Sequence, residues 1–385
     1  MPLAPYGIYI HVPFCASRCI YCDFYSTTQT AKAGLYVEAV IREMMQRAHD
    51  IQGRVETIYF GGGTPTQLGR EGIGRILEAL HQQFDLSHCH EITLEANPED
   101  FITGAWRLEK EKRRADEPLG SDINRVSMGV QSMVDEELSM LHRRHNAEHV
   151  REAVERLRET GITNLSLDLM YGLPGQTMQS LAYSIDEVIA LKPQHISAYN
   201  LSIEEGTPLS RMVEKREVTV CDDETCLAMA ALLRDKLHAA GYEQYEISNY
   251  ALPEYHSRHN SSYWTQTPYL GLGPGAHSYD GKRRRSWNAC NLNEYMQGKR
   301  EEEEEMLTDL DLYNECVMLG LRTKWGIDAR CFERYFTDHA TLDNLHTTLL
   351  SLQGRGLVHT AGDRICLTEE GLALADEVIR ELIVI

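Results

Sequence analysis

Three cysteines near the start of the chain have the residue type and the spacing of a metal centre. Cys15, Cys19 and Cys22 follow a C-x3-C-x2-C pattern. They come directly after the apolar run at residues 7–11, so a tight loop leaving a buried strand can turn all three sulfurs toward one point. Three thiolates without an obvious fourth ligand predict a metal centre that keeps one coordination position open.

This pattern resembles the signature of the radical S-adenosylmethionine (SAM) superfamily. A [4Fe-4S] cluster held by three cysteines leaves one iron free for another ligand. The resemblance implies that the amino and carboxylate groups of SAM chelate this iron, and that reduction of the sulfonium yields a 5'-deoxyadenosyl radical. The cofactors would then carry the chemistry while the protein positions them.

A Cys3His zinc site that recruits His11 is the alternative. Structural zinc usually draws on two separated ligand pairs, and the chain has no second Cys-x2-Cys pair. The remaining cysteines are scattered singly, which is typical of reduced thiols rather than of a disulfide framework. They are Cys89, Cys221, Cys226, Cys290, Cys316, Cys331 and Cys366.

Length, composition and charge narrow the class of protein. A chain of 385 residues can form one large α/β domain and a small second one, and its 42% hydrophobic and 25% charged residues are ordinary for a globular protein. A formal charge of -20 disfavours binding along nucleic acid, and with it a tRNA-modifying radical enzyme. The first basic residue is Arg18 and no apolar run nears ~20 residues, so we expect a cytoplasmic protein without a transmembrane span.

Short β-branched or aromatic runs alternate with segments of helical periodicity. We predict strands at residues 7–11, 56–60, 91–95, 124–129, 164–169 and 195–200. We predict helices near residues 33–49, 70–84, 99–110, 147–160, 178–191 and 222–240. Six such units predict an α/β fold with a parallel sheet that curls into a partial (β/α)6 barrel, with its chemistry where strand ends meet the following loops.

Candidate ligand-binding residues fall at those strand ends. The glycines at residues 61–63 follow the second strand, where they let the backbone approach a ligand closely, although a tight turn alone also needs them. Glu95 closes the third strand and is either a ribose-binding carboxylate or a helix cap. Gln131 ends the fourth strand, with Arg143 twelve residues later, and Asp168 is a lone acid in an apolar strand that must have a partner.

Together these segments resemble the oxygen-independent coproporphyrinogen III oxidase group of radical SAM proteins and its heme-chaperone relatives. The matching segments are residues 9–24, 61–66, 125–132, 168–177, 200–208 and 271–278. The resemblance implies SAM contacts at Tyr9, Gly63, Thr64, Pro65, Glu95, Gln131, Arg143 and Asp168.

Two positions favour the heme-chaperone branch of this family. The oxidases have a further cysteine two residues after the third one, whereas this chain has Phe24, as the chaperones do. The chaperones also have an H-N-x-x-Y-W motif, which this chain matches at residues 259–264. The resemblance therefore implies heme as a ligand and heme-accepting apo-proteins as partners, with respiratory-chain proteins at the membrane as candidates. The oxidase, a radical decarboxylase, is the alternative.

The H-N-x-x-Y-W motif also suits a porphyrin chemically. His259 can supply an imidazole to heme iron, and Tyr263, Trp264 and Tyr269 offer flat apolar faces. The alternative is that His259 hydrogen-bonds within the core while the aromatic side chains pack. The arginine run at residues 283–285 is more typical of a solvated surface, and we assign it no role.

The last part of the chain predicts a second domain. Five glutamates at residues 301–305 repel one another and predict an exposed linker or helix start, so we place one domain at residues 1–300 and another at 301–385. Helical patterns and a short hairpin beyond it predict a winged-helix-like domain. Residues 341–353, its third helix, contain no lysine or arginine, which favours a lid or a protein-docking surface over DNA binding. The charged stretch at residues 109–117 receives no role.

Overall fold

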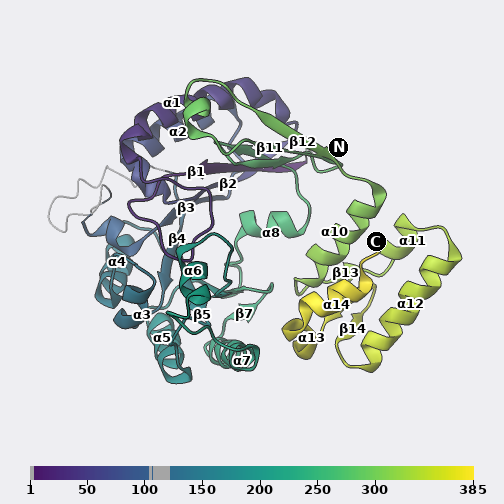
Figure 1. Cartoon of the computed structure of the whole chain (residues 1–385). Coiled ribbons are helices and arrows are strands. Elements are labelled where there is room, and N and C mark those ends of the chain that lie inside the picture. Colours follow the sequence, from purple (N-terminus) through teal and green to yellow (C-terminus); the bar gives the residue numbers. More distant parts are fainter. Residues whose placement is uncertain (1–3, 104–105, 107–121) are drawn as a thin grey trace.

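The computed structural model describes residues 4–103, 106 and 122–385. A large α/β unit carries a smaller, mostly helical unit at its side (Figure 1). The charged stretch at residues 109–117 lies outside the described residues. In the described part of the chain, no helix combines the length and the apolar character needed to cross a bilayer.

Six parallel strands form the centre of the large unit and neighbour one another in chain order. They are β1 (Pro5–Val12), β2 (Arg54–Gly62), β3 (Glu91–Ala96), β4 (Arg125–Gln131), β5 (Asn164–Tyr171) and β6 (His195–Asn200). All six predicted strands are confirmed.

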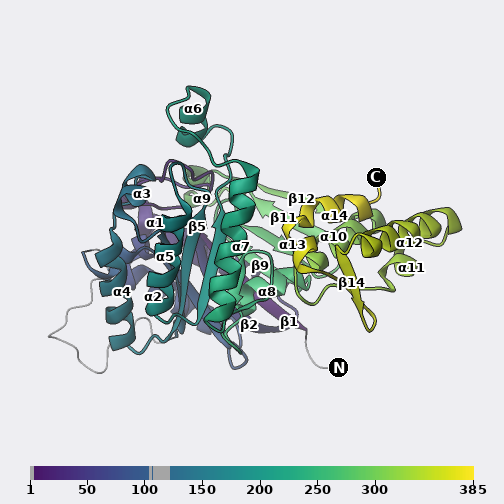
Figure 2. The same ribbon diagram turned by 90° about the horizontal axis from the view of Figure 1, so that it is seen from below.

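Helices cover the outer face of this sheet (Figures 1 and 2). They are α1 (Ala33–Arg47), α2 (Gly69–Gln83), α3 (Asp135–Met140), α4 (Ala147–Glu159), α5 (Met178–Ala190) and α7 (Asp223–Ala239). The short helix α6 (Pro208–Glu214) stands apart from the sheet (Figure 2). The prediction of a helix at residues 99–110 is wrong for the residues that the structure describes. Pro98–Phe101 forms a single 3-10 turn, which Asn97 and Asp100 cap reciprocally. The rest of that segment lies largely outside the described residues.

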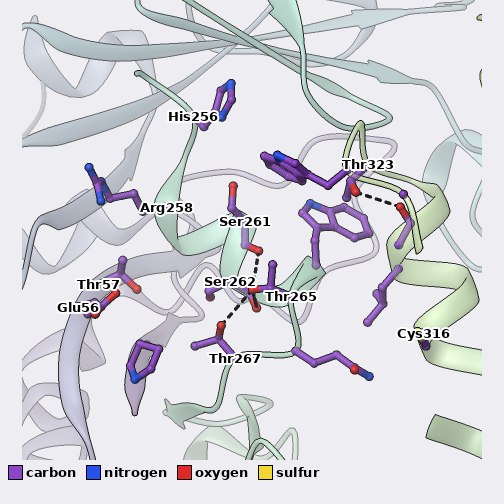
Figure 3. A pocket seen from close by; sticks show the side chains of 18 of the residues that line it. Glu56, Thr57, His256, Arg258, Ser261, Ser262, Thr265, Thr267, Cys316 and Thr323 are labelled. Atoms are coloured by element: carbon purple, nitrogen blue, oxygen red, sulfur yellow. Dashed lines mark hydrogen bonds between the residues drawn. The ribbon is translucent and has the colours of Figure 1, made fainter. Parts of the chain in front are cut away.

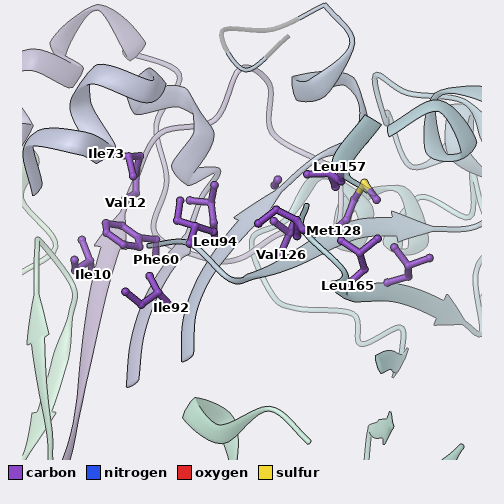
Figure 4. Packing of buried hydrophobic residues seen from close by; sticks show 14 of the residues in the cluster. Ile10, Val12, Phe60, Ile73, Ile92, Leu94, Val126, Met128, Leu157 and Leu165 are labelled. Atoms are coloured by element: carbon purple, nitrogen blue, oxygen red, sulfur yellow. The ribbon is translucent and has the colours of Figure 1, made fainter. Parts of the chain in front are cut away.

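Side-chain alternation along the strands separates an apolar layer from a polar barrel interior. On β5, Leu165, Leu167 and Leu169 are fully buried in the main hydrophobic core with side chains of the covering helices, and Figure 4 shows Leu165 there. The intervening Ser166 and Asp168 instead bond to polar side chains of neighbouring strands. The barrel interior is therefore lined by groups that can bind and titrate, while the leucines supply the burial that holds the helices.

Further strands that we did not predict extend the sheet at both ends. They are β7 (Glu243–Gln244), β8 (Asn249–Ala251), β9 (Tyr269–Leu272), β10 (His277–Tyr279), β11 (Arg284–Asn288) and β12 (Glu302–Met306). β9 runs parallel to β1, and β8 runs antiparallel to β6.

The glutamate block forms the edge strand β12, so the prediction of a linker or helix start there is wrong. The block is exposed, as we expected, but it pairs antiparallel to β11. Arg284 contacts Glu304 at 2.9 Å and Arg300 contacts Glu302 at 2.8 Å. These arginines offset the repulsion that we expected to keep the segment out of regular structure.

The C-terminal domain has its own hydrophobic core. Two short helices, α8 (Arg258–Trp264) and α9 (Leu292–Met296), precede it in the large unit. The domain contains α10 (Asp309–Leu321), β13 (Ile327–Asp328), α11 (Cys331–Tyr335), α12 (His339–Gly354), β14 (Val358–Ala361), β15 (Arg364–Leu367), α13 (Glu369–Ala373) and α14 (Ala375–Leu382). The predicted helices and hairpin are present, except that the last helix breaks at Leu374 and a short strand joins the hairpin.

Backbone and charged contacts fix this domain to the barrel. The backbone of residues 322–324 bonds to the segment around β7, with Ile247 N donating to Arg322 O at 3.0 Å. Glu315 of α10 forms an ion pair with Arg285 of β11 at 2.6 Å. The domain therefore stands at a defined place beside α8.

We predict that shortening Leu167 to alanine lowers the free energy of unfolding by about 2–5 kcal/mol, because the change leaves a cavity between β5 and its helices. Urea unfolding of the purified protein measures this. The control is Leu350→Ala on α12, whose side chain is 68% exposed and should change stability by less than about 0.5 kcal/mol. Equal effects of the two changes would contradict the assignment of the leucines to the packed face.

Candidate cofactor site

The cysteine loop leaves β1 at the carboxyl end of the barrel. Its backbone is fastened where Cys15 N donates to Thr27 O at 2.9 Å and Thr27 N donates to Pro13 O at 2.6 Å. Cys15 is buried, while Cys19 and Cys22 are half-buried. All three sulfur-bearing side chains line one cavity of about 420 Å³. The structure therefore brings the predicted cysteines together at one site.

The glycine-rich segment after β2 forms the wall beside the cysteine loop. Gly63 N donates to Val12 O at 2.8 Å, and Thr64 N donates to Phe14 O at 2.7 Å. A Cβ atom at position 63 would lie 2.7 Å from Phe14 O and 3.0 Å from Cys15 Sγ. Only glycine fits here, so the backbone itself faces the cavity and leaves room for a group held by the cysteines.

Two carboxylates from neighbouring strands face the same cavity. Glu95 accepts the Tyr59 hydroxyl at 2.7 Å and the Gly62 amide at 3.2 Å. Burial raises the pKa of Glu95 to about 7 and that of Asp168 to about 6. Asp168 accepts Ser127 Oγ at 3.3 Å, which supplies the partner that we expected for this acid. Both groups can thus change charge near neutral pH, where they could accept hydroxyl donors of a ligand.

Arg143 connects the far wall of the cavity to the cysteine loop. Its guanidinium donates to Asn97 Oδ1 and to Gly129 O, each at 2.6 Å, and to Cys19 Sγ at 3.4 Å. A side chain at position 129 would lie 3.1 Å from this guanidinium, so glycine leaves it space. A cation held beside the Cys19 sulfur and facing the cavity suits an anionic group on a ligand.

Gln131 stands at an irregular end of β4. The register with β5 shifts between Gly129 and Gln131, and Gln131 adopts a φ of 67°. This left-handed conformation is unfavourable for a residue with a side chain, and such strain concentrates at binding sites. The bulge turns the Gln131 side chain into the cavity wall.

Six of the eight predicted SAM contacts line this cavity: Gly63, Thr64, Glu95, Gln131, Arg143 and Asp168. Tyr9 and Pro65 are not among its lining residues. Pro65 is buried where the segment after β2 turns away. Tyr9 lines an adjacent cavity of about 350 Å³, which shares the walls Phe24, Gly62 and Glu95 with the first.

The geometry fits an iron-sulfur cluster better than zinc. His11 is occupied at both ring nitrogens, by the Tyr9 hydroxyl at 3.2 Å and by Tyr25 O at 3.0 Å. It also lies outside the cysteine cavity. Among the described residues, no three histidine, cysteine or acidic side chains converge on a point that a single ion could occupy. Thiols spread around a cavity instead suit a cluster in which each thiolate binds a different iron.

His259 lies away from the cysteine cavity, on α8. Its ring is fully buried, with Nδ1 2.9 Å from Thr57 Oγ1 and Nε2 2.8 Å from the Tyr263 hydroxyl. Burial, together with the charge of Arg125, lowers the pKa of His259 to about 3. Heme ligation by His259 stays a prediction, and it requires one ring nitrogen to give up its present partner.

Several polar residues of the site escaped the sequence analysis. Asn97 joins Arg143 to Thr64, and it lies only two positions after Glu95. Tyr59 and Ser127 also face the barrel interior, where they bond to Glu95 and Asp168, and the buried Arg125 lies two positions before Ser127 on β4. The signal that could have found them is the period of two along each strand, in which polar residues interrupt an otherwise apolar sequence.

Comparison with known proteins defines the class of protein first. The pattern of the Radical SAM superfamily matches residues 9–188, and that of the HemN C-terminal domain matches residues 307–374. The solved structure of coproporphyrinogen III oxidase (HemN) from Escherichia coli superposes with a TM-score of 0.81 at 24% identity, covering 100% of this chain and 91% of that one. The barrel, the cysteine loop and these matches define a radical SAM protein.

Whole-chain relatives define the family. The heme chaperone HemW of Bacillus subtilis is 34% identical over 380 residues, covering 96% of this chain and 97% of that protein. HemW of Mycobacterium tuberculosis strain H37Rv is 34% identical, covering 100% and 96%. The mitochondrial radical S-adenosyl methionine domain-containing protein 1 of Danio rerio is 30% identical, covering 97% and 86%. The chain therefore belongs to the HemW family.

The cofactors of this class are a [4Fe-4S] cluster and SAM, and the residues present fit both. A bound cluster and SAM supply one-electron chemistry. The chain itself contributes the three thiols, a wall without side chains at Gly63, and the carboxylates and guanidinium around the remaining space.

We expect Cys19→Ala to remove most of the bound iron and the brown colour of protein purified without air, because three-point thiolate ligation fails when one ligand is lost. Iron analysis and visible absorption measure this. Cys89→Ala is the control and should keep full iron content, since Cys89 lies outside the cavity. A Cys19→Ala protein with full iron would refute the ligand assignment.

The raised pKa of Glu95 predicts pH-dependent nucleoside binding. Ribose hydroxyls donate hydrogen bonds to the ionised carboxylate, and a proton on Glu95 competes with them. Because Glu95 ionises near pH 7, the affinity for the nucleoside should rise by about tenfold from about pH 6 to pH 8. The probe is 5'-methylthioadenosine, which has no group that titrates in this range, measured by calorimetry.

Glu95→Gln is the matched variant for this measurement. It should bind the nucleoside with little pH dependence, because the amide does not titrate. An unchanged pH profile in Glu95→Gln would show that another group controls binding and would contradict the role of Glu95.

Proposed function

We propose that the protein is a heme chaperone, which binds heme and transfers it to acceptor apo-proteins while carrying a [4Fe-4S] cluster and SAM. The observation that carries this proposal is the similarity to HemW proteins over nearly the whole chain, including the C-terminal domain. A shared barrel alone would support only radical SAM chemistry, because one fold hosts many functions.

Phe24 supports the chaperone over the oxidase. Where the oxidases have a further cysteine, Phe24 is 64% exposed and forms a wall that the cysteine cavity shares with the adjacent one. A phenyl group offers neither a proton nor a thiolate at this junction. It instead presents an apolar face to whatever enters the second cavity.

The lining of the adjacent cavity supports the same conclusion. Coproporphyrinogen carries four propionates, and an enzyme that holds it beside SAM needs cations to bind them. The lining residues of this cavity include tyrosines, histidines and Glu95, but no lysine or arginine. The cavity therefore suits an oxidase substrate poorly.

We further propose that the eight predicted residues hold SAM. Glu95 and Asp168 would accept its hydroxyl and amino donors, and Arg143 would bind its carboxylate. Gly63, Thr64 and Gln131 would supply the wall, with Pro65 stiffening the exit of the glycine-rich segment. Tyr9, on the far side of Glu95, would act through the shared wall rather than by direct contact.

We also propose a cytoplasmic location and acceptors among heme-dependent proteins, including respiratory-chain proteins at the membrane. The C-terminal domain would serve as a docking surface. Its helix α12 has no lysine or arginine, and it exposes Leu350. Apolar exposure without basic charge supports contact with protein rather than with nucleic acid.

The chaperone proposal predicts that the anaerobic protein binds heme with a stable absorbance band and leaves coproporphyrinogen unchanged. Heme titration and product analysis under reducing conditions with SAM measure the two activities. Formation of protoporphyrinogen would overturn the chaperone in favour of the oxidase. A protein that does not bind heme would refute the proposal as well.

His259→Gln tests the predicted heme ligand within the same titration. Glutamine can still hydrogen-bond to Thr57 and Tyr263 but cannot ligate iron as imidazole does. A changed heme spectrum with unaltered iron-sulfur content would support ligation by His259. An unchanged spectrum would leave His259 as the residue that fixes α8.

A further inference from the structure

A second large cavity lies at the opposite end of the barrel from the cysteines. It has a volume of about 690 Å³, against about 420 Å³ for the cysteine cavity. The beginnings of β1 and β2 form its floor, and α8 and α10 form its sides (Figure 3). It therefore lies between the barrel and the C-terminal domain, and the proposed SAM site does not use it.

α8 separates this cavity from the adjacent cavity of about 350 Å³. Tyr263 lines the smaller one, whereas Ser261, Ser262 and Trp264 line the larger. The helix is held in place because the buried Glu91 carboxylate accepts the amides of Arg258 at 2.8 Å and His259 at 3.0 Å. Because the Glu91 carboxylate binds the free amides at the start of α8, this helix forms a fixed wall of the cavity.

The walls of the larger cavity are apolar and partly flat. Trp264 from α8 and Trp325 after α10 both line it, and Trp325 is 38% exposed. Leu319 and Ile327 complete the apolar lining on the side of the C-terminal domain. Trp264 is half-buried, and the partly exposed Trp325 ring packs against Tyr245 and His256. Indole rings beside aliphatic side chains suit a planar aromatic ligand.

Two arginines line the same cavity without forming a close ion pair. Arg258 and Arg364 are exposed, and neither forms an ion pair within the part of the chain that the structure describes. The nearby acids have closer partners: Glu56 pairs with Arg54 at 2.7 Å, and Asp328, which stands opposite Arg364 in the β13–β15 pairing, pairs with Arg330 at 2.7 Å. In a chain of net charge -20, unpaired cations beside an apolar cavity favour an anionic ligand.

We propose that this cavity is the heme site, with the macrocycle between Trp264 and Trp325 and the propionates on Arg258 and Arg364. This inference rests on the proposed chaperone function. It places the heme at the junction with the C-terminal domain, not at the SAM site. His90 also lines the cavity, and its exposed ring makes no hydrogen bond or ion pair among the described residues. In this site His90 replaces His259 as the iron ligand, because His259 does not line the cavity.

Heme titration of Arg258→Gln, Arg364→Gln and the double variant tests the site. Each single change should weaken heme binding on the order of tenfold, since each removes a charge-assisted hydrogen bond to a propionate. Arg380→Gln on α14 is the control, because Arg380 is also exposed and lies outside the cavity. Iron-sulfur content and thermal unfolding should match the wild type in all variants.

Heme with both propionates capped as amides tests the same contact without a mutation. It should bind the wild type as weakly as heme binds the double variant, and the double variant should no longer distinguish the two ligands. The site would be overturned if the double variant bound heme as tightly as the wild type does. It would also be overturned if the wild type bound the capped ligand as tightly as heme. Either result would leave the chaperone function intact. Absence of heme binding by the wild type would instead refute the function itself.

Discussion

The polar interior of the barrel depends on one buried cation. Arg125 is 1% exposed, and its charge lowers the pKa values of Glu95 and Asp168 against the larger effect of burial. Burial raises the pKa values of both carboxylates, and hydrogen bonds from Tyr59 to Glu95 and from Ser197 to Asp168 lower them more than Arg125 does. These hydrogen bonds and the charge of Arg125 together bring the titration of both carboxylates near to physiological pH, where they can serve a ligand.

The same interior organises both ends of the barrel. Toward the carboxyl ends of the strands, the carboxylates and Arg143 surround the cysteine cavity. Toward the other ends, Glu91 points inward and accepts hydrogen bonds from the start of α8. The His259 ring hydrogen-bonds to Thr57 at one nitrogen and to Tyr263 at the other. A single helix therefore separates two cavities, and its position is set by polar contacts that start inside the barrel.

The sequence predicted what repeats along the chain. Alternating strand and helix patterns located all six parallel strands, and the cysteine spacing located the cluster loop. The sequence could not show which side chains meet inside the barrel. The roles of Arg125 and Asn97 depend on partners from other parts of the chain. The prediction for the glutamate block was wrong because it considered only the repulsion between neighbouring glutamates. In the folded chain, pairing with β11 places Arg284 beside Glu304 and offsets that repulsion.

The proposed function requires heme to pass directly from this protein to an acceptor. The measurement that tests it is the rate of heme transfer from the loaded protein to an apo-acceptor at increasing acceptor concentration. Direct transfer predicts a rate that rises with acceptor concentration above the rate of spontaneous heme release. A rate that equals spontaneous release at every acceptor concentration would contradict the claim.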